Sequence, residues 1–325
     1  MVYLRPLARR LAILAMAMAL PVAALAQTFP SKPIKLVVPY LTGGLPDVLA
    51  RLVAQKMSDT LGQQVIVENK PGASGILAAE SVARAEPDGH TLFVGDIGHY
   101  ALNPFIHAKL PYDPNRDLLP VTQAVHGPLF LVVNPALNVQ SVQELIAAAK
   151  ARPGINYGSP GNASVHQLAG AQLGLMAGVT LTHIPYKSNV QAIPGLLTND
   201  VSMMFVALPS VLPHVKAGKL RIIASGTAQR SPLMPDAPTV AESGFPGFLA
   251  VTTVGFFAPG GTPAGLITRL NAETVRALRS PEVESKVPSL GANIVAGTAE
   301  QFAEQIRADQ ALYKRLVKEV GVKID

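Results

Sequence analysis

The sequence predicts an α/β protein, and three observations predict it. Short apolar runs rich in β-branched residues, such as residues 34–39, recur along the chain. Segments with helical periodicity separate these runs, and glycine-containing turns often join the two. Such alternation is typical of βαβ units around a largely parallel sheet. The chain has 325 residues and no single obvious boundary, which suits two lobes that exchange strands.

Each element follows from its own pattern. The apolar runs predict strands, and the periodic stretches after the first two runs predict helices. We expect strands near residues 34–39, 65–68, 91–94, 129–133, 155–157, 201–206 and 220–224, and helices near residues 46–61 and 74–84.

Three further helices are predicted from their first residues. Ser141 with Glu144 and Thr298 with Gln301 fit the capping-box spacing. Thr262 precedes a proline, which predicts an N-cap followed by a first-turn proline.

The last of these helices has an apolar stripe at steps of three, four or seven residues, interrupted once by Asp309. We therefore expect one face of this helix to pack on a core. The stripe comprises Phe302, Ile306, Tyr313, Leu316 and Val320.

Residues 1–26 are typical of an export signal, with three arginines, an apolar run and a small-x-small site that ends at Ala26. We expect cleavage after Ala26 and a periplasmic mature protein. The formal net charge of +6 includes those three arginines, so 24 basic against 21 acidic residues leaves +3 for residues 27–325. This modest charge predicts no nucleic-acid partner. The chain has no cysteine, which excludes disulfides and thiolate metal sites.

Catalytic signatures are missing from the chain. It has no Gly-x-Ser-x-Gly elbow, phosphate loop or Gly-x-Gly-x-x-Gly motif. Its histidines never show His-x-x-x-His spacing, and residues 113–124 lack the glycine and glutamate of a calcium loop. We therefore predict a protein that is not an enzyme and holds no cofactor or metal.

Three loops between a strand and a helix are candidate binding loops, and the third of them spans residues 69–75. The first contains Tyr40, Thr42, Gly43, Gly44 and Asp47. Its glycines let backbone N–H groups approach a ligand, and the start of the following helix favours an anion. An ordinary βα turn explains the glycines equally well, and helix capping explains Asp47.

The second loop is richer in hydroxyl and amide groups, with Ser159, Gly161, Asn162 and Ser164, and His166 follows just inside the helix. One of these groups must cap the helix, and the others could donate to a carboxylate. Two such loops, one from each half, would place donors on both walls of a cleft that suits a small anion.

These loops and several ordered blocks give the sequence a resemblance to the tripartite tricarboxylate transporter substrate-binding receptors, also called Bug proteins. The resemblance covers essentially the whole chain after residue 26. The blocks lie at residues 37–51, 61–63, 67–73, 87–92, 110–114, 157–168, 183–187 and 212–220.

The resemblance implies a two-lobed type II periplasmic binding fold, in which each lobe is a mixed sheet flanked by helices. We expect residues 27–124 with 251–325 in one lobe and residues 125–250 in the other. The implied function is capture of a small dicarboxylate, tricarboxylate or aromatic acid between the lobes, for delivery to membrane permease subunits by a monomer. The implied ligand contacts are Tyr40, Thr42, Gly43, Gly44, Asp47, Ser74, Ser159, Gly161, Asn162, Ser164, His166 and Val206.

Three positions depart from the family pattern. Thr42 stands where a proline usually precedes the two glycines, and Ser188 stands where a glycine usually follows Lys187. Val206 occupies a position where several members carry an aspartate suited to a ligand ammonium, so this cleft is expected to favour a ligand without an amine.

Two alternative functions remain open at this point. A receptor of the same kind could present its ligand to the ectodomain of a sensor kinase. A secreted hydrolase could use Ser164 and His166, but residues two apart on a helix do not face each other.

Overall fold

The computed structural model describes residues 29–321, and its residues from Lys32 onward belong to one compact unit. The predicted export signal lies outside the described residues. Within the described part of the chain, no helix is long and apolar enough to cross a membrane.

A mixed sheet organises this unit, with strand order β2-β1-β3-β9-β4-β7-β5-β6. The first half is built on strands β1, β2 and β3, and the second half on strands β5, β6, β7 and β8. The first half has parallel pairs at β1–β2 and β1–β3. The strands are β1 (Ile34–Val38), β2 (Val65–Asn69), β3 (Thr91–Asp96), β4 (Leu118–Val133), β5 (Ile155–Ser159), β6 (Leu181–Pro185), β7 (Met203–Ala207), β8 (Arg221–Ser225), β9 (Val251–Pro259) and β10 (Asn293–Ile294).

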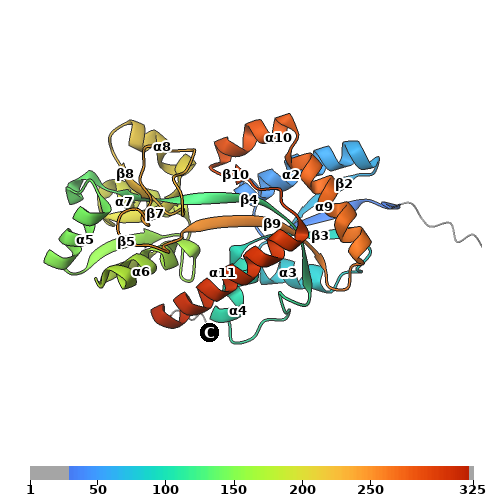
Figure 1. Cartoon of the computed structure of the whole chain (residues 1–325), viewed down its shortest axis with the longest axis horizontal. Helices are drawn as coiled ribbons and strands as arrows, with labels where there is room; N and C mark the ends of the chain where they lie inside the picture. Colours follow the sequence, from blue (N-terminus) through green and yellow to red (C-terminus); the bar gives the residue numbers. More distant parts are fainter. Residues whose placement is uncertain (1–28, 322–325) are drawn as a thin grey trace, which may run out of the picture. The chain divides into compact units, whose positions relative to one another are not determined.

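Two long antiparallel strands connect the halves (Figure 1). Strand β4 pairs with β9 from Leu118 to Pro128, and then with β7 and β8 from Leu129 onward. Strand β9 also pairs with β3. The sheet is therefore mixed rather than largely parallel, because these two strands run against their neighbours.

Helices cover both faces of the two halves, and the longest, α11, lies against β4 and α6 (Figure 1). Short helical turns precede α3 and α4, and the turn before α4 is π-helical. The helical elements are α2 (Leu45–Leu61), η1 (Ala73–Gly75), α3 (Ile76–Ala83), η2 (Gly98–Leu102), α4 (Asn103–Ile106), η3 (Pro135–Leu137), α5 (Val142–Ala151), α6 (Val165–Ala177), α7 (Asn189–Thr198), α8 (Leu208–Lys216), α9 (Ala264–Leu278), α10 (Pro281–Lys286), η4 (Val287–Leu290) and α11 (Ala299–Val320).

The predicted strands are all present, although several are longer than expected. Strands β6, β9 and β10 were not among the predicted elements. The helix expected at residues 74–84 begins only at Ile76, because η1 precedes it.

The helix starts agree with prediction in two of three cases. Thr298 and Gln301 form the complete capping box. Ser141 accepts from the Glu144 backbone as expected, but the Glu144 carboxylate accepts from Gln140 instead of Ser141. The Thr262 prediction is wrong: α9 begins after Pro263, and the Thr262 hydroxyl donates back to the Pro259 carbonyl at 2.8 Å.

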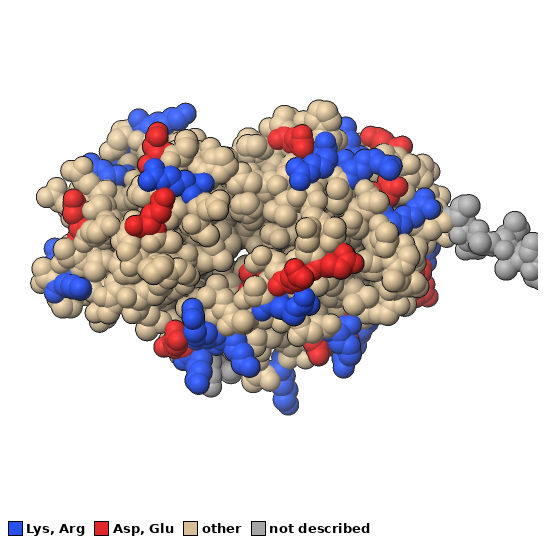
Figure 2. All heavy atoms as spheres, in the orientation of Figure 1, with Lys and Arg blue, Asp and Glu red and all other residues tan. Residues whose placement is uncertain are grey.

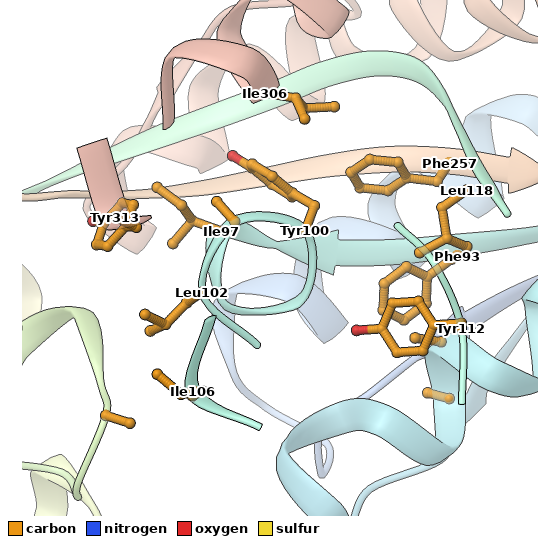
Figure 3. Close-up of a cluster of buried hydrophobic side chains, with 14 of the residues drawn as sticks. Phe93, Ile97, Tyr100, Leu102, Ile106, Tyr112, Leu118, Phe257, Ile306 and Tyr313 are labelled. Atoms are coloured by element: carbon orange, nitrogen blue, oxygen red, sulfur yellow. The ribbon is translucent and has the colours of Figure 1, made fainter. Parts of the chain in front are cut away.

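The core of the first half surrounds the η2 turn. Ile97, Tyr100 and Leu102 project from this segment, with Ile106 just beyond it (Figure 3). The predicted stripe of α11 packs on the same cluster. Asp309 does not interrupt this packing: its buried carboxylate accepts a hydrogen bond from the Tyr100 hydroxyl at 2.9 Å.

Candidate ligand-binding site

A cavity of about 720 Å³ lies where the parallel strands of both halves end. The segments that follow β1, β2 and β3 line it from the first half, and those that follow β5 and β6 line it from the second. Ligands of open α/β sheets bind at the carboxyl ends of the strands, which makes this cavity the candidate site. Side chains that line the cavity include Tyr40, Leu41, Ser74, Asp96, His99, Asn103, Asn162, Ser164, His166, Lys187, Ser188 and Thr252.

The β1–α2 loop uses its polar groups to support itself. The buried Asp47 carboxylate accepts from the Gly43 backbone at 2.9 Å, from Asn69 Nδ2 at 2.8 Å and from Arg51. Gly43 has φ of +96°, a conformation that glycine adopts readily. Asp47 therefore closes the loop and does not line the cavity.

Two residues of this loop, Tyr40 and Leu41, line the cavity. The Tyr40 hydroxyl donates to Asp96, which lies at the end of β3. Leu41 is 74% exposed.

Asp96 belongs to a hydrogen-bonded group at the start of η2. Its Oδ1 accepts from the Gly98 backbone at 2.9 Å, and His99 Nδ1 lies 2.9 Å from the same oxygen. Burial alone would raise the pKa of Asp96, but the His99 ring and the hydrogen bonds from His99, Tyr40 and Gly98 outweigh burial and hold the pKa below its usual value. Asp96 is therefore an ionised carboxylate in the cavity wall.

His99 is buried, and its Nε2 has no hydrogen-bond partner among the described residues. This nitrogen faces Gly75, where a Cβ would overlap it. Gly75 has φ of +77°, so both its conformation and its close contact with His99 favour glycine.

In the β5–α6 loop, the hydroxyl groups of two serines form hydrogen bonds within the protein. Ser164 caps α6 by accepting from Gln167, and its hydroxyl donates to the Gly161 carbonyl at 2.8 Å. The fully buried Ser159 hydroxyl lies 2.8 Å from the same carbonyl and 2.6 Å from His183 Nε2. Asn162 is left to line the cavity.

His166 lines the cavity from the first turn of α6. Its Nδ1 lies 2.8 Å from the Phe205 carbonyl oxygen, which can only accept, so Nδ1 carries the proton. Burial lowers the pKa of His166, and the bond to Phe205 and the charge of Asp96 offset this only in part. The ring is therefore neutral at pH 7, and Nε2 is a hydrogen-bond acceptor.

The cavity brings together five of the predicted contacts: Tyr40, Ser74, Asn162, Ser164 and His166. The other seven, Thr42, Gly43, Gly44, Asp47, Ser159, Gly161 and Val206, do not line it.

The inference from Val206 needs correction. Its side chain is fully buried in β7, in a cluster with Phe130 and Leu208. Because Val206 does not reach the cavity, it carries no information on whether a ligand has an amine.

Sequence reasoning missed Asp96, His99, Asn103 and Thr252 and left Lys187 in doubt. A polar group directly after an apolar strand was the available signal for Asp96, since strand ends meet at one edge of a parallel sheet. The described residues contain no cluster of histidine and acidic side chains that could hold a metal ion.

Charged side chains cover a minor part of the face shown in Figure 2. On the face shown in Figure 2, basic and acidic side chains are interspersed over both halves.

Comparisons with known proteins identify the family and the fold of this chain. Residues 49–322 match the family described as "Tripartite tricarboxylate transporter family receptor". The protein BugT of Bordetella pertussis is 35% identical over 301 residues, which cover 92% of each chain.

Two similar structures hold organic acids. The R. palustris protein Rpa4515, solved with adipate, is 33% identical with a TM-score of 0.79, over 91% of this chain and 99% of that one. The R. palustris protein MatC, solved with malate, is 31% identical with a TM-score of 0.75, over 89% of this chain and 100% of that one. The chain thus shares the fold of periplasmic binding proteins.

Proposed function

This chain belongs to the tripartite tricarboxylate transporter receptor family, and from that premise we propose that it captures a small organic carboxylate in the periplasm and delivers it to membrane permease subunits. Residues 1–26 would direct export and be removed after Ala26. The two lobes, residues 27–124 with 251–325 and residues 125–250, would close on the ligand as a monomer.

One observation carries this proposal. The segments after five parallel strands, from both halves, line one cavity, and they present donors to it. Within the described part of the chain, the side chains of Ser74, Asn162 and Lys187 form no hydrogen bond or ion pair with the protein. A carboxylate needs such donors, and the cationic Lys187 adds charge attraction. The adipate and malate held by similar proteins support the same ligand class.

The serine and histidine geometry speaks against a hydrolase. Ser164 donates to a carbonyl and His166 Nδ1 is held by Phe205, so the two form no nucleophile–base pair. Ser159 does contact His183, but its side chain is fully buried. We therefore propose a binding protein without catalytic activity.

The proposal is tested by calorimetry and thermal shift on protein purified from the periplasm, with a panel of di-, tri- and aromatic carboxylates. A ligand at about 100 times its Kd should stabilise the fold by about 2.7 kcal/mol. We expect Lys187→Ala to weaken binding by about 10- to 150-fold, because a charge-assisted contact contributes about 1.5–3 kcal/mol. The control Lys150→Ala removes the same charge from an exposed position on α5 and should leave affinity unchanged.

Absence of heat and of thermal shift across the whole panel would contradict carboxylate capture. If the Lys187→Ala and Lys150→Ala variants bind the ligand with equal affinity, Lys187 does not contact the ligand.

A further inference from the structure

A second cavity, of about 560 Å³, lies beside the two strands that connect the halves. Strand β4 contributes Gln123 and His126 to its lining. Asn293 of β10 and Gln305 of α11 line it from the side of the first half, on whose core α11 packs. Residues 227–232, which follow β8, line it from the second half. We call this the reverse cavity, and the cavity at the strand ends the ligand cavity.

The two cavities lie on opposite faces of β9. Thr252 lines the ligand cavity, whereas its neighbours Val251 and Thr253 line the reverse cavity. Successive side chains of a strand point to opposite faces of the sheet. His126, which is paired with Thr253 in the β4–β9 register, also lines the reverse cavity. The strands that connect the halves therefore separate the two cavities.

No bond across the reverse cavity fixes its width. Within the described part of the chain, no hydrogen bond or ion pair joins residues 227–232 to β4, β10 or α11. Arg230 is the one charged side chain among the described residues of the lining, and it is paired with Glu242 inside the second half. The two walls can therefore approach or separate without breaking a bond between them.

The two cavities should change width in opposite directions. The proposed function has the halves close on a ligand, and β4 and β9 are the strands that run between the halves (Figure 1). A hinge motion about these strands brings the halves together on one face of the strands and moves them apart on the other. Because the reverse cavity lies on the other face, it widens when the ligand cavity narrows. A group that fills the reverse cavity opposes its narrowing and so favours closure of the ligand cavity.

We propose that the reverse cavity determines the affinity for the carboxylate, because the volume of the side chains in it sets how readily the halves close on the ligand. The proposal rests on the proposed function and adds to it a control of affinity outside the ligand cavity. The residues concerned are positioning residues, since none of them lines the ligand cavity. The apparent Kd is the intrinsic Kd divided by the fraction of protein in the binding-competent state, so a filler that raises this fraction tightens binding.

A single cysteine allows the reverse cavity to be filled in steps after the protein has folded. The chain has no cysteine, so Ala228→Cys introduces one reactive thiol. Ala228 is an exposed residue of the segment after β8 and lines the reverse cavity. The purified periplasmic protein is labelled with methyl, propyl or benzyl methanethiosulfonate, and dithiothreitol removes the label again. The matched control is Ala217→Cys, at an exposed position after α8 that lines neither cavity.

Calorimetry with adipate and malate as probes measures the effect on affinity. We expect the Kd of the labelled Ala228→Cys protein to fall as the label grows, by at least about threefold with the benzyl group. The factor should be the same for both acids, because the label does not contact the ligand. Reduction should restore the original Kd, and the labelled Ala217→Cys protein should keep it throughout.

Small-angle X-ray scattering of the unliganded protein gives a readout that needs no ligand. The radius of gyration should decrease as the label at position 228 grows, and it should not change with the label at position 217. Absence of binding across the whole carboxylate panel would contradict the proposed function, whereas the scattering result still decides this inference.

Three results would overturn the proposal while leaving carboxylate capture intact. The first is a Kd and a radius of gyration that match the Ala217→Cys control at every label size. The second is an affinity that weakens as the label grows. The third is a factor that differs between adipate and malate, which would show that the label acts on the ligand directly and not through closure of the halves.

Discussion

The β1–α2 and β5–α6 loops look alike in sequence, but they divide their polar groups differently. In the first, Asp47 binds the loop backbone and its neighbours, so mainly Tyr40 and Leu41 reach the cavity. In the second, Ser164 caps the helix, and Asn162 and His166 reach the cavity. A glycine-rich strand-to-helix loop thus marks a site, but helix capping and loop support decide which side chains face the ligand.

The largest expected effect comes from Asp47→Ala in the first loop. Removal of this buried carboxylate leaves the Gly43 N–H and the Asn69 amide without their acceptor. We expect a loss of about 2–3 kcal/mol in the free energy of unfolding, measured by urea denaturation. Asp59→Ala, at an exposed position of the same helix, is the control. Equal losses in both variants would show that Asp47 does not support the loop.

The contribution of Asp47 should also depend on pH. Burial alone would raise its pKa, but hydrogen bonds from Arg51, Gly43 and Asn69 lower it below the usual value. A lowered pKa in the folded state stabilises the fold above the unfolded pKa, and this stabilisation is lost as pH falls through the folded value. The stability gap between wild type and Asp47→Asn should therefore shrink below about pH 4. A gap that widens in acid would contradict this assignment.

Ser164→Ala in the second loop should have a smaller effect. It removes the N-cap of α6, so we expect a loss of about 1 kcal/mol in unfolding free energy. Ser164→Gly should recover most of this loss, because glycine is tolerated at an N-cap. Since the hydroxyl is committed to Gly161, the affinity for the carboxylate should change much less than in Asn162→Ala. A larger loss of ligand affinity in Ser164→Ala than in Asn162→Ala would show that Ser164, rather than Asn162, contacts the ligand.

Thr42→Ala should have the smallest effect of the series. Thr42 is exposed and does not line the cavity. We expect a change within about 0.5 kcal/mol in unfolding free energy and unchanged ligand affinity. A marked loss of ligand affinity in calorimetry would show that Thr42 contacts the ligand.

Local patterns predicted much of the fold. The caps at Ser141, Ser164 and Thr298 depend on groups three residues apart, which a sequence displays directly. Strand β9 was missed although its sequence is apolar, because its partners β3 and β4 lie more than a hundred residues away in the chain.

The candidate site was predicted less completely, for a similar reason. The sequence identified the two loops and His166, but it could not show that Asp96 lines the same cavity as His166. It also could not show that Val206 points into a core. Contacts of this kind depend on how segments that are distant in the chain pack together.

The sequence by itself determined the alternation of strands and helices, the caps at Ser141 and Thr298 and the position of glycine-rich loops at strand ends, since these depend on interactions between near neighbours. Only the tertiary structure decided that β4 and β9 join the two halves and that loops from five strands meet at one cavity. It also turned Asp309 from an interruption of the α11 stripe into a buried partner of Tyr100. Each of these depends on contacts between distant segments, which local propensity does not encode.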